Sequence, residues 1–199
     1  MLVMDADSFV EVLFDVKDGG KEIDWRKRRL VTLRLAQAYK RLELKSKHSR
    51  ILNCGGYLEF RRYRDHSMRL NSANFCYIRL CPMCAWRRSR KAFAQVSRIM
   101  GSIGDEYEFV FLTLTVKNVD AEGLEGQINK LFAAFKKLCE RKRFKDAVHG
   151  WVRAFETTFN WQSMEFHPHL HCILAVDKSY FTSDAYIPQQ EYCQLWQYC

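Results

Sequence analysis

The sequence predicts an α+β fold in which an antiparallel sheet carries helices on one face. Three strand-like runs and one amphipathic helix occur in the order strand, helix, strand, strand, over 107–116, 127–145, 150–159 and 166–176. A short polar loop joins the last two runs, as in a hairpin of antiparallel strands. Helices gathered on one face of such a sheet bury its apolar side and leave the other side open.

The N-terminal half is predicted to be a smaller, mixed module. Residues 1–20 end in Asp-Gly-Gly and are predicted to form a loose leader, and helices are predicted over 25–44 and 85–103. Between them, 57–62 and 74–79 are predicted to form hairpin strands. The expected apolar stripes are Leu30, Leu35, Ala38, Tyr39 and Leu42 on the first helix, and Trp86, Phe93, Val96, Met100 and Ile103 on the second.

The run 107–116 is rich in aromatic and β-branched residues, so it is predicted to be a buried central strand. Thr113 and Thr115 fall on one face of this strand, and they either satisfy each other or line a site. The helix at 127–145 shows the three-and-four spacing of an amphipathic helix. Its expected apolar face comprises Ile128, Leu131, Phe132, Phe135, Leu138 and Cys139.

Three histidines in 166–176 form the most informative feature of the chain. Side chains alternate between the faces of a strand, so His167, His169 and His171 share one face. The opposite face carries an apolar row suited to a core, namely Leu170, Cys172, Leu174 and Val176. Histidines two residues apart on a strand lie about 6.6 Å apart at the backbone, and their rings can converge on one metal ion.

Glu156 lies in the preceding strand-like run, and a hairpin would bring its carboxylate beside His169 and His171. Two histidines and one carboxylate form a recurrent open metal site. The alternative is ordinary, because single histidines on strands are often just partly buried polar residues, and a lone His-x-His is a weak pattern.

The chain carries 32 Lys and Arg against 23 Asp and Glu, a net charge of +9. The basic residues cluster at 26–29, 87–91 and 136–145, with Trp25, Trp86 and Phe93 interleaved. This pattern favours a nucleic-acid partner, although part of each cluster serves as a solvated helix face. No run approaches the ~18 apolar residues of a membrane span. The acidic N-terminus argues against a secretory signal, so a cytoplasmic protein with no membrane partner is expected.

Eight cysteines in a chain without an export signal indicate metal binding rather than disulfides. Cys81 and Cys84 form a C-x-x-C knuckle, and Cys76 lies five positions earlier. Cys139 and Cys172 are expected to be core residues.

Four segments together resemble a known family: 79–89 (RLCPMCAWRRS), 111–118 (FLTLTVKN), 167–171 (HPHLH) and 174–183 (LAVDKSYFTS). In this order they are similar to the replication initiators of small Gram-positive rolling-circle plasmids, which belong to the HUH endonuclease superfamily. The resemblance implies an HUH-endonuclease-like fold preceded by a small zinc-binding module. The expected parts are 1–50 for the leader and first helix, 51–105 for the zinc-binding module and basic helix, and 106–199 for an incomplete HUH core.

The resemblance also implies a function, namely origin binding and metal-dependent, site-specific DNA nicking by transesterification. Its partners would be single-stranded or hairpin DNA of a plasmid origin and host replication proteins. The implied ligands are His169, His171 and Glu156 for a catalytic Mg²⁺ or Mn²⁺, and Cys54, Cys76, Cys81 and Cys84 for a structural zinc. The expected DNA contacts are the basic cluster at a helix start beside the zinc module and three residues near the histidine site, namely Arg87, Arg88, Arg90, Lys91, Thr113, Thr115 and His167. Pro168 restricts the backbone of His167 and favours a role for it outside the metal shell.

The sequence departs from the family at the nucleophile. The resemblance implies a tyrosine in a Tyr-x-x-Lys context after the histidines, but Tyr180, Tyr186, Tyr192 and Tyr198 all lack the lysine. We therefore expect a C-terminally truncated initiator that is inactive alone in covalent cleavage. The alternative is a non-catalytic, zinc-dependent DNA-binding protein that occupies the origin. An HUH transposase or relaxase is a third interpretation, and the zinc module and segment order argue against it.

Overall fold

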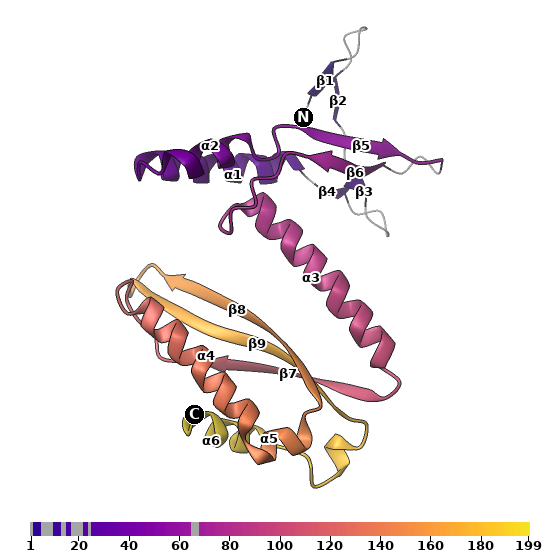
Figure 1. Cartoon of the computed structure of the whole chain (residues 1–199), viewed down its shortest axis with the longest axis vertical. Coiled ribbons are helices and arrows are strands. Elements are labelled where there is room, and N and C mark those ends of the chain that lie inside the picture. The colour runs from indigo at the N-terminus through magenta and orange to yellow at the C-terminus, as the bar shows by residue number, and fades with distance from the viewer. Residues whose placement is uncertain (1, 5–9, 13–14, 17–21, 24, 65–67) are drawn as a thin grey trace. The chain divides into compact units, whose positions relative to one another are not determined.

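A computed structural model describes residues 2–4, 10–12, 15–16, 22–23, 25–64 and 68–199. The chain divides into two compact units, Met1–Gln95 and Val96–Cys199, which are described separately (Figure 1). Much of the expected leader lies outside the described residues. The described residues before Trp25 form two short antiparallel pairs, β1 (Leu2–Met4) with β2 (Val10–Val12) and β3 (Asp15–Val16) with β4 (Glu22–Ile23).

The N-terminal unit contains the expected helix as α1 (Trp25–Arg41), followed by a second helix, α2 (Lys45–Asn53). Glu43 between them has a φ of 56°, which ends the first helix. The predicted apolar stripe is wrong in part, because Leu30, Ala38 and Leu42 are exposed. The buried side chains of α1 are instead Trp25, Thr32, Ala36 and Tyr39, because the packing of α1 on neighbouring elements sets which face points inward.

The hairpin of this unit pairs β5 (Leu58–Arg62) with β6 (Met68–Ala73). The second strand predicted at 74–79 is wrong, since that segment is a loop. The backbone N–H of Cys76 donates to the sulfur of Cys54 at 3.4 Å, and Tyr77 has a φ of 58°. Neither geometry is compatible with a continuing ladder, so the strand ends before the cysteine.

The basic helix is confirmed as α3 (Pro82–Ile103), with proline in its first turn. Trp86 packs edge-on against Trp25 at 5.1 Å, as a core residue does. The core position predicted for Phe93 is wrong, because its side chain is exposed in the middle of the helix. None of the helices in the described part of the chain is both long and apolar enough to cross a membrane.

The C-terminal unit is built on an antiparallel sheet of β7 (Tyr107–Thr115), β8 (Gly150–Asn160) and β9 (Glu165–Asp177). The strand order is β7-β9-β8, so β9 is central and β7 lies at an edge. The central position predicted for β7 is therefore wrong. The tight hairpin puts β8 on one side of β9, and β7 takes the remaining side.

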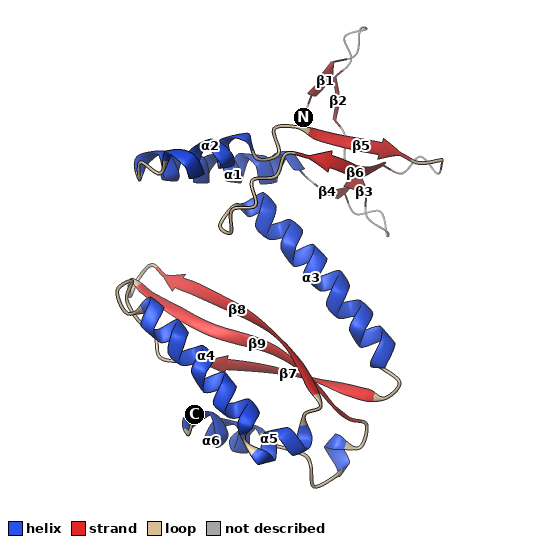
Figure 2. Cartoon of the chain, in the orientation of Figure 1, coloured by secondary structure: helices blue, strands red, loops and turns tan. Residues whose placement is uncertain are grey.

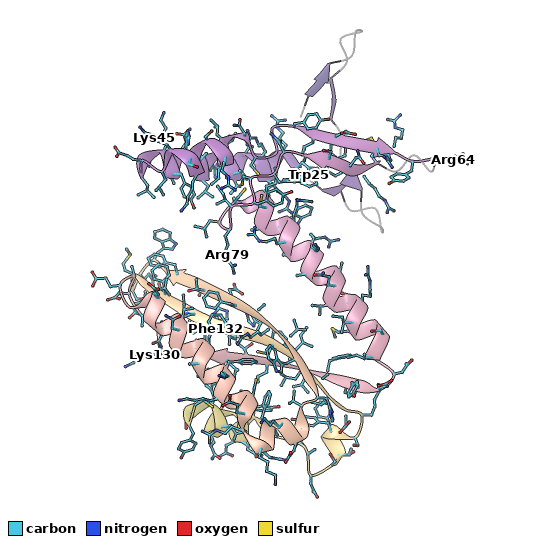
Figure 3. All side chains as sticks on the ribbon, in the orientation of Figure 1. Trp25, Lys45, Arg64, Arg79, Lys130 and Phe132 are labelled. Atoms are coloured by element: carbon cyan, nitrogen blue, oxygen red, sulfur yellow. The ribbon has the colours of Figure 1, made fainter. Side chains whose placement is uncertain are left out.

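One face of this sheet is covered by α4 (Leu124–Glu140), α5 (Lys142–Ala147), the short 3₁₀ helix η1 (Tyr180–Thr182) and α6 (Gln189–Gln197) (Figure 2). The single helix predicted at 127–145 is two helices, because Arg141 has an extended backbone. The apolar row of β9 is confirmed, since Leu170, Cys172, Leu174 and Val176 are fully buried against these helices. Phe132 of α4 packs beside Phe155 of β8 (Figure 3).

The α+β prediction, with antiparallel sheets and helices, is thus confirmed. The helices of the C-terminal unit cover one face of β9, and the histidines lie on the other face.

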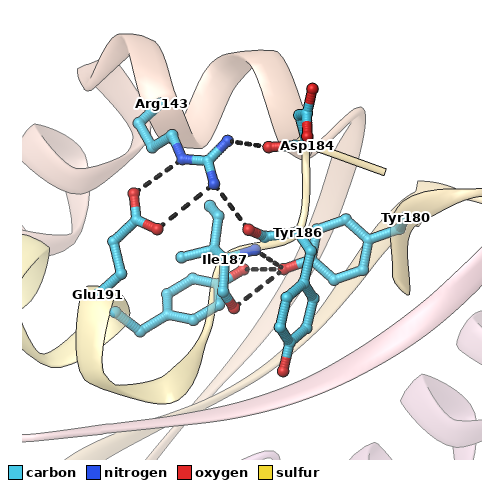
Figure 4. Close-up of polar contacts among 7 residues, drawn as sticks. Arg143, Tyr180, Asp184, Tyr186, Ile187 and Glu191 are labelled. Atoms are coloured by element: carbon cyan, nitrogen blue, oxygen red, sulfur yellow. Dashed lines mark hydrogen bonds and ion pairs between the residues drawn. The ribbon is translucent and has the colours of Figure 1, made fainter. Parts of the chain in front are cut away.

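Arg143 of α5 holds the segment that follows β9. Arg143 of α5 donates to the carbonyls of Asp184 and Tyr186 at 2.8 and 2.6 Å and pairs with Glu191 of α6 at 2.8 Å (Figure 4).

Two valines of one sheet test the burial of its two faces. Replacing Val176, on the helix-covered face, with alanine is expected to cost about 2 kcal/mol of unfolding free energy from lost burial and a residual cavity. Val152→Ala, on the opposite and more exposed face, is expected to cost less than half as much. Urea denaturation of both variants measures the difference, and equal losses would contradict the assignment of the faces.

Candidate functional site

Four buried cysteines lie together in the N-terminal unit. The sulfur of Cys84 lies 3.6 Å from those of Cys54 and Cys76, and Cys81 lies 3.6 Å from Cys54. All four sulfurs fall within 4.8 Å of one another, and all are free thiols. Bonds of about 2.3 Å to a tetrahedral zinc would separate the sulfurs by about 3.8 Å. The donor set and its spacing therefore fit zinc.

Three separate elements supply the four thiols. Cys54 caps the end of α2, Cys76 lies in the loop after β6, and Cys81 and Cys84 flank the start of α3. The positive end of a helix dipole favours thiolates at that start. Arginines brace the backbone, because Arg29 donates to the carbonyl of Cys54 and Arg50 to that of Cys76, both at 2.6 Å. Part of the basic cluster at 26–29 is thus structural.

The thiols also bias one another's ionisation. The hydrogen bond between the sulfurs of Cys54 and Cys81 lowers the pKa of Cys81 to about 4, and the same bond, with burial, raises the pKa of Cys54. Metal ligation requires thiolates, so a ready thiolate at Cys81 suits this role. Cys172, in the other unit, is different, since burial raises its pKa to about 11 and leaves it an inert core residue, as predicted.

The second group lies on the open face of the C-terminal sheet. Register pairs His169 of β9 with Glu156 of β8 on one side and Thr115 of β7 on the other, and it pairs His171 with Thr113. The carboxylate Oε2 of Glu156 lies 3.2 Å from Nε2 of His171 and 3.7 Å from Nε2 of His169. The predicted hairpin does bring the three side chains together.

Hydrogen bonds orient both rings. Nδ1 of His169 donates to the carbonyl of His167 at 3.0 Å, and Nδ1 of His171 lies 3.1 Å from the hydroxyl of Thr113. The bond to a carbonyl places the proton of neutral His169 on Nδ1, so its Nε2 lone pair faces Glu156. Thr113 thus serves as an orienting partner for His171 in the structure.

His167 lies outside this group of three, as predicted. Its Nδ1 is 2.7 Å from Oδ1 of Asn118, which follows β7. Sequence reasoning missed the roles of Asn118 and of Phe111, whose ring stacks on that of His171 at 5.5 Å and 21°. Both residues belong to the segment 111–118, and Phe111 falls on the same strand face as Thr113 and Thr115, which is the signal that could have found it.

The basic residues of α3 are all exposed, but three have contacts within the protein, and one of these is Arg90, which lies 5.8 Å from the ring of Phe93. Arg87 lies 3.8 Å from the ring of Phe75, and Arg88 donates to the carbonyl of Arg79. Trp25, one of the aromatic residues interleaved with the basic clusters, is buried in the core of the N-terminal unit.

The tyrosines after the histidines divide into two pairs. Tyr180 and Tyr192 are buried with their hydroxyls 3.4 Å apart, and burial raises the pKa of Tyr192. Tyr186 and Tyr198 are exposed.

A family model described as "Replication protein" matches residues 67–199. The chain belongs to this replication protein family. It is 39% identical to "Protein rep" of Streptococcus pneumoniae over 193 residues, which is 94% of this chain and 60% of that protein. It is 37% identical to "Protein rep" of Bacillus amyloliquefaciens and 38% identical to that of Lactiplantibacillus plantarum, covering 57% and 60% of those proteins.

The chain thus spans about 60% of the length of these relatives. No solved structure matches it. The replication protein match begins within the hairpin of the N-terminal unit, so it includes Cys76, Cys81, Cys84 and the histidine face, whereas Cys54 precedes it. The resemblance to replication initiators is confirmed at the level of the family.

Two adjacent glycines test how tightly the thiols of this replication protein are held. Gly55 has a φ of 68°, and a Cβ there would lie 2.2 Å from the sulfur of buried Met83. Gly55→Ala is therefore expected to open the module and to speed alkylation of the four cysteines, read by mass spectrometry. Gly56→Ala, whose Cβ would lie 3.3 Å from the Asn53 carbonyl oxygen, requires a much smaller shift and should speed alkylation far less. Equal rates for both variants would contradict the role of Gly55.

Proposed function

We propose that this chain is the metal- and origin-binding part of a plasmid rolling-circle replication initiator, with an HUH-endonuclease-like fold. The observation that carries the proposal is the position of the Glu156 carboxylate between the Nε2 atoms of His169 and His171. Membership of the replication protein family supports DNA, and a plasmid origin in particular, as the partner.

The donor set fits a divalent cation. Two imidazole nitrogens and one carboxylate oxygen leave coordination positions open, and Mg²⁺ or Mn²⁺ bound there would neutralise and orient a phosphodiester. His169 and His171 would hold the ion through Nε2, with their rings fixed by the His167 carbonyl and by Thr113. Thr115, which pairs with His169, and His167, held by Asn118, are proposed to contact the DNA beside it.

The four cysteines are proposed to bind a structural zinc. This ion would join α2, the loop after β6 and the start of α3, which share a small core. The basic residues of α3 that follow directly would then project from a fixed base. Arg87, Arg88, Arg90 and Lys91 are exposed, and we propose that they contact DNA phosphates.

None of Tyr180, Tyr186 and Tyr192, which follow the histidines, lies in a Tyr-x-x-Lys segment, the context expected of the nucleophile. Tyr180 and Tyr192 are buried and bonded to each other, and the third residue after Tyr186 is Gln189 rather than a lysine. We propose that this chain by itself binds metal and DNA but forms no covalent DNA adduct. A role as a non-catalytic origin binder is the second candidate, and the same observation favours it.

Cobalt replacement tests the zinc site. The chain is expected to bind one equivalent of Co²⁺ with thiolate-to-metal charge-transfer absorption, and Cys84→Ser should lose most of it. Cys193→Ser is the matched control, because Cys193 is an exposed cysteine on α6. Elemental analysis that finds no zinc in freshly purified protein, or equal losses in both variants, would refute the site.

Calorimetry with Mn²⁺ tests the second site. His171→Ala is expected to weaken Mn²⁺ binding by at least about tenfold, since removing a ligand should cost no less than removing an outer-shell partner. His149→Ala is the control and should leave Mn²⁺ binding unchanged. His149 lies just before β8, and its Nε2 is 3.0 Å from Oδ2 of Asp177, outside the candidate site.

Supercoiled DNA carrying a candidate origin then tests the chemistry. Incubation with Mn²⁺ is expected to give at most slow metal-dependent nicking and no protein–DNA adduct. A phosphotyrosine at Tyr186 or Tyr198, found by mass spectrometry, would overturn the proposal that the nucleophile is missing from these residues.

A further inference from the structure

An exposed aromatic ring lies directly beside the candidate metal ligands. Phe111 of β7 is 68% exposed and shares the open sheet face with Thr113 and His171. Its ring stacks on that of His171 with 21° between the planes. One face of a candidate ligand ring is thus covered by a phenyl group that itself remains open to solvent.

Phe111 also borders a groove of about 500 Å³ along the free edge of β7. The other wall comes from η1, the loop after it and α6, and the groove is lined by Phe111, Thr113, Phe181, Tyr186, Tyr192 and Trp196. Phe181 is 58% exposed and Tyr186 is 43% exposed, with their ring centroids 6.0 Å apart. We call Phe111, Phe181 and Tyr186 the aromatic track.

The far wall of the groove is rigidly held. Arg143 binds the Tyr186 carbonyl, and the backbone N–H of Ile187 donates to the Tyr180 hydroxyl at 3.0 Å (Figure 4). The indole N–H of Trp196 donates to the Thr115 carbonyl at 2.7 Å and ties α6 to the strand edge. The exposed rings of the track therefore stand on fixed backbone.

Resting on the proposed function, we propose that the aromatic track binds bases of a single DNA strand whose phosphate lies at Glu156, His169 and His171. A strand that approaches His171 along the edge of β7 meets Phe111, because the two rings are stacked. Aromatic side chains stack on every base, which gives affinity without sequence preference. A peptide strand added to β7 fits less well, since Trp196 already occupies the Thr115 carbonyl on that edge.

Binding of a labelled single-stranded oligonucleotide to the whole chain, followed by fluorescence anisotropy, tests the track. Phe111→Leu keeps an apolar side chain but removes the flat ring, and affinity should fall by about 5- to 150-fold, the range for one stacked base. Phe111→Trp should keep the affinity. The dependence of affinity on salt should not change in Phe111→Leu, because no phosphate contact is lost.

An oligonucleotide with abasic sites gives the decisive comparison. The unchanged chain should bind it more weakly than the intact strand, and this difference in affinity should be smaller for Phe111→Leu, which keeps only Phe181 and Tyr186 of the track. Tyr57→Leu, at an exposed aromatic residue of the other unit, is the control and should behave as the unchanged chain. Full affinity of Phe111→Leu for the intact strand would overturn the track. The proposal would also be overturned if the unchanged chain sedimented as a dimer and Phe111→Leu as a monomer. The groove would then bind a second copy of this chain rather than DNA bases.

Mn²⁺ binding separates this inference from the function on which it rests. If the chain binds no Mn²⁺ but Phe111→Leu still loses base-dependent affinity, the metal proposal fails and the track stands. If Mn²⁺ binds normally and Phe111→Leu binds single-stranded DNA as tightly as the unchanged chain, only the proposal of the track fails.

Discussion

The register of β9 against its two neighbours is the constraint on which the C-terminal unit depends. Antiparallel pairing puts Glu156 and Thr115 on either side of His169, and strict alternation puts Leu170, Cys172, Leu174 and Val176 under the helices. A slip of one residue would expose the apolar row and bury the histidines, so the hydrophobic core itself fixes the geometry of the site. Site and core are two faces of the same strand.

The cysteine module depends on a different kind of constraint. Its core is small, and four of its buried residues are thiols that make few strong hydrogen bonds of their own. Arg29 and Arg50 bind the carbonyls of Cys54 and Cys76, and Gly55 makes the close approach to Met83 possible. A backbone so tightly specified around four sulfurs is better explained by a tetrahedral ion than by thiol packing alone.

The sequence predicted what local periodicity controls and failed where tertiary packing decides. Alternation correctly separated His169 and His171 from the core residues Leu170 and Cys172, and the hairpin correctly brought in Glu156. Strand order is not written in periodicity, so β7 was wrongly placed at the centre. On α1, apolar residues such as Leu30 face solvent while Thr32 is buried. The face of α1 that points inward is set by packing against its neighbours, since the Thr32 hydroxyl lies 3.9 Å from the sulfur of Cys81. The strand predicted at 74–79 failed because Cys76 turns toward the other thiols.

The edge position of β7 links the fold to the proposed chemistry. A central strand would have both edges paired and no groove beside it, whereas an edge strand offers a solvent-open border that proteins usually blunt with charges, proline or a covering element. Here α6 covers one end through Trp196, and the uncovered part carries Phe111 next to His171. Phe111 borders the same groove as exposed Phe181 and Tyr186, and grouped exposed apolar side chains of this kind mark ligand-binding grooves more than a single exposed ring does. The arrangement is therefore understood most simply if the edge that the fold leaves unpaired is the path by which a strand of DNA reaches the histidines.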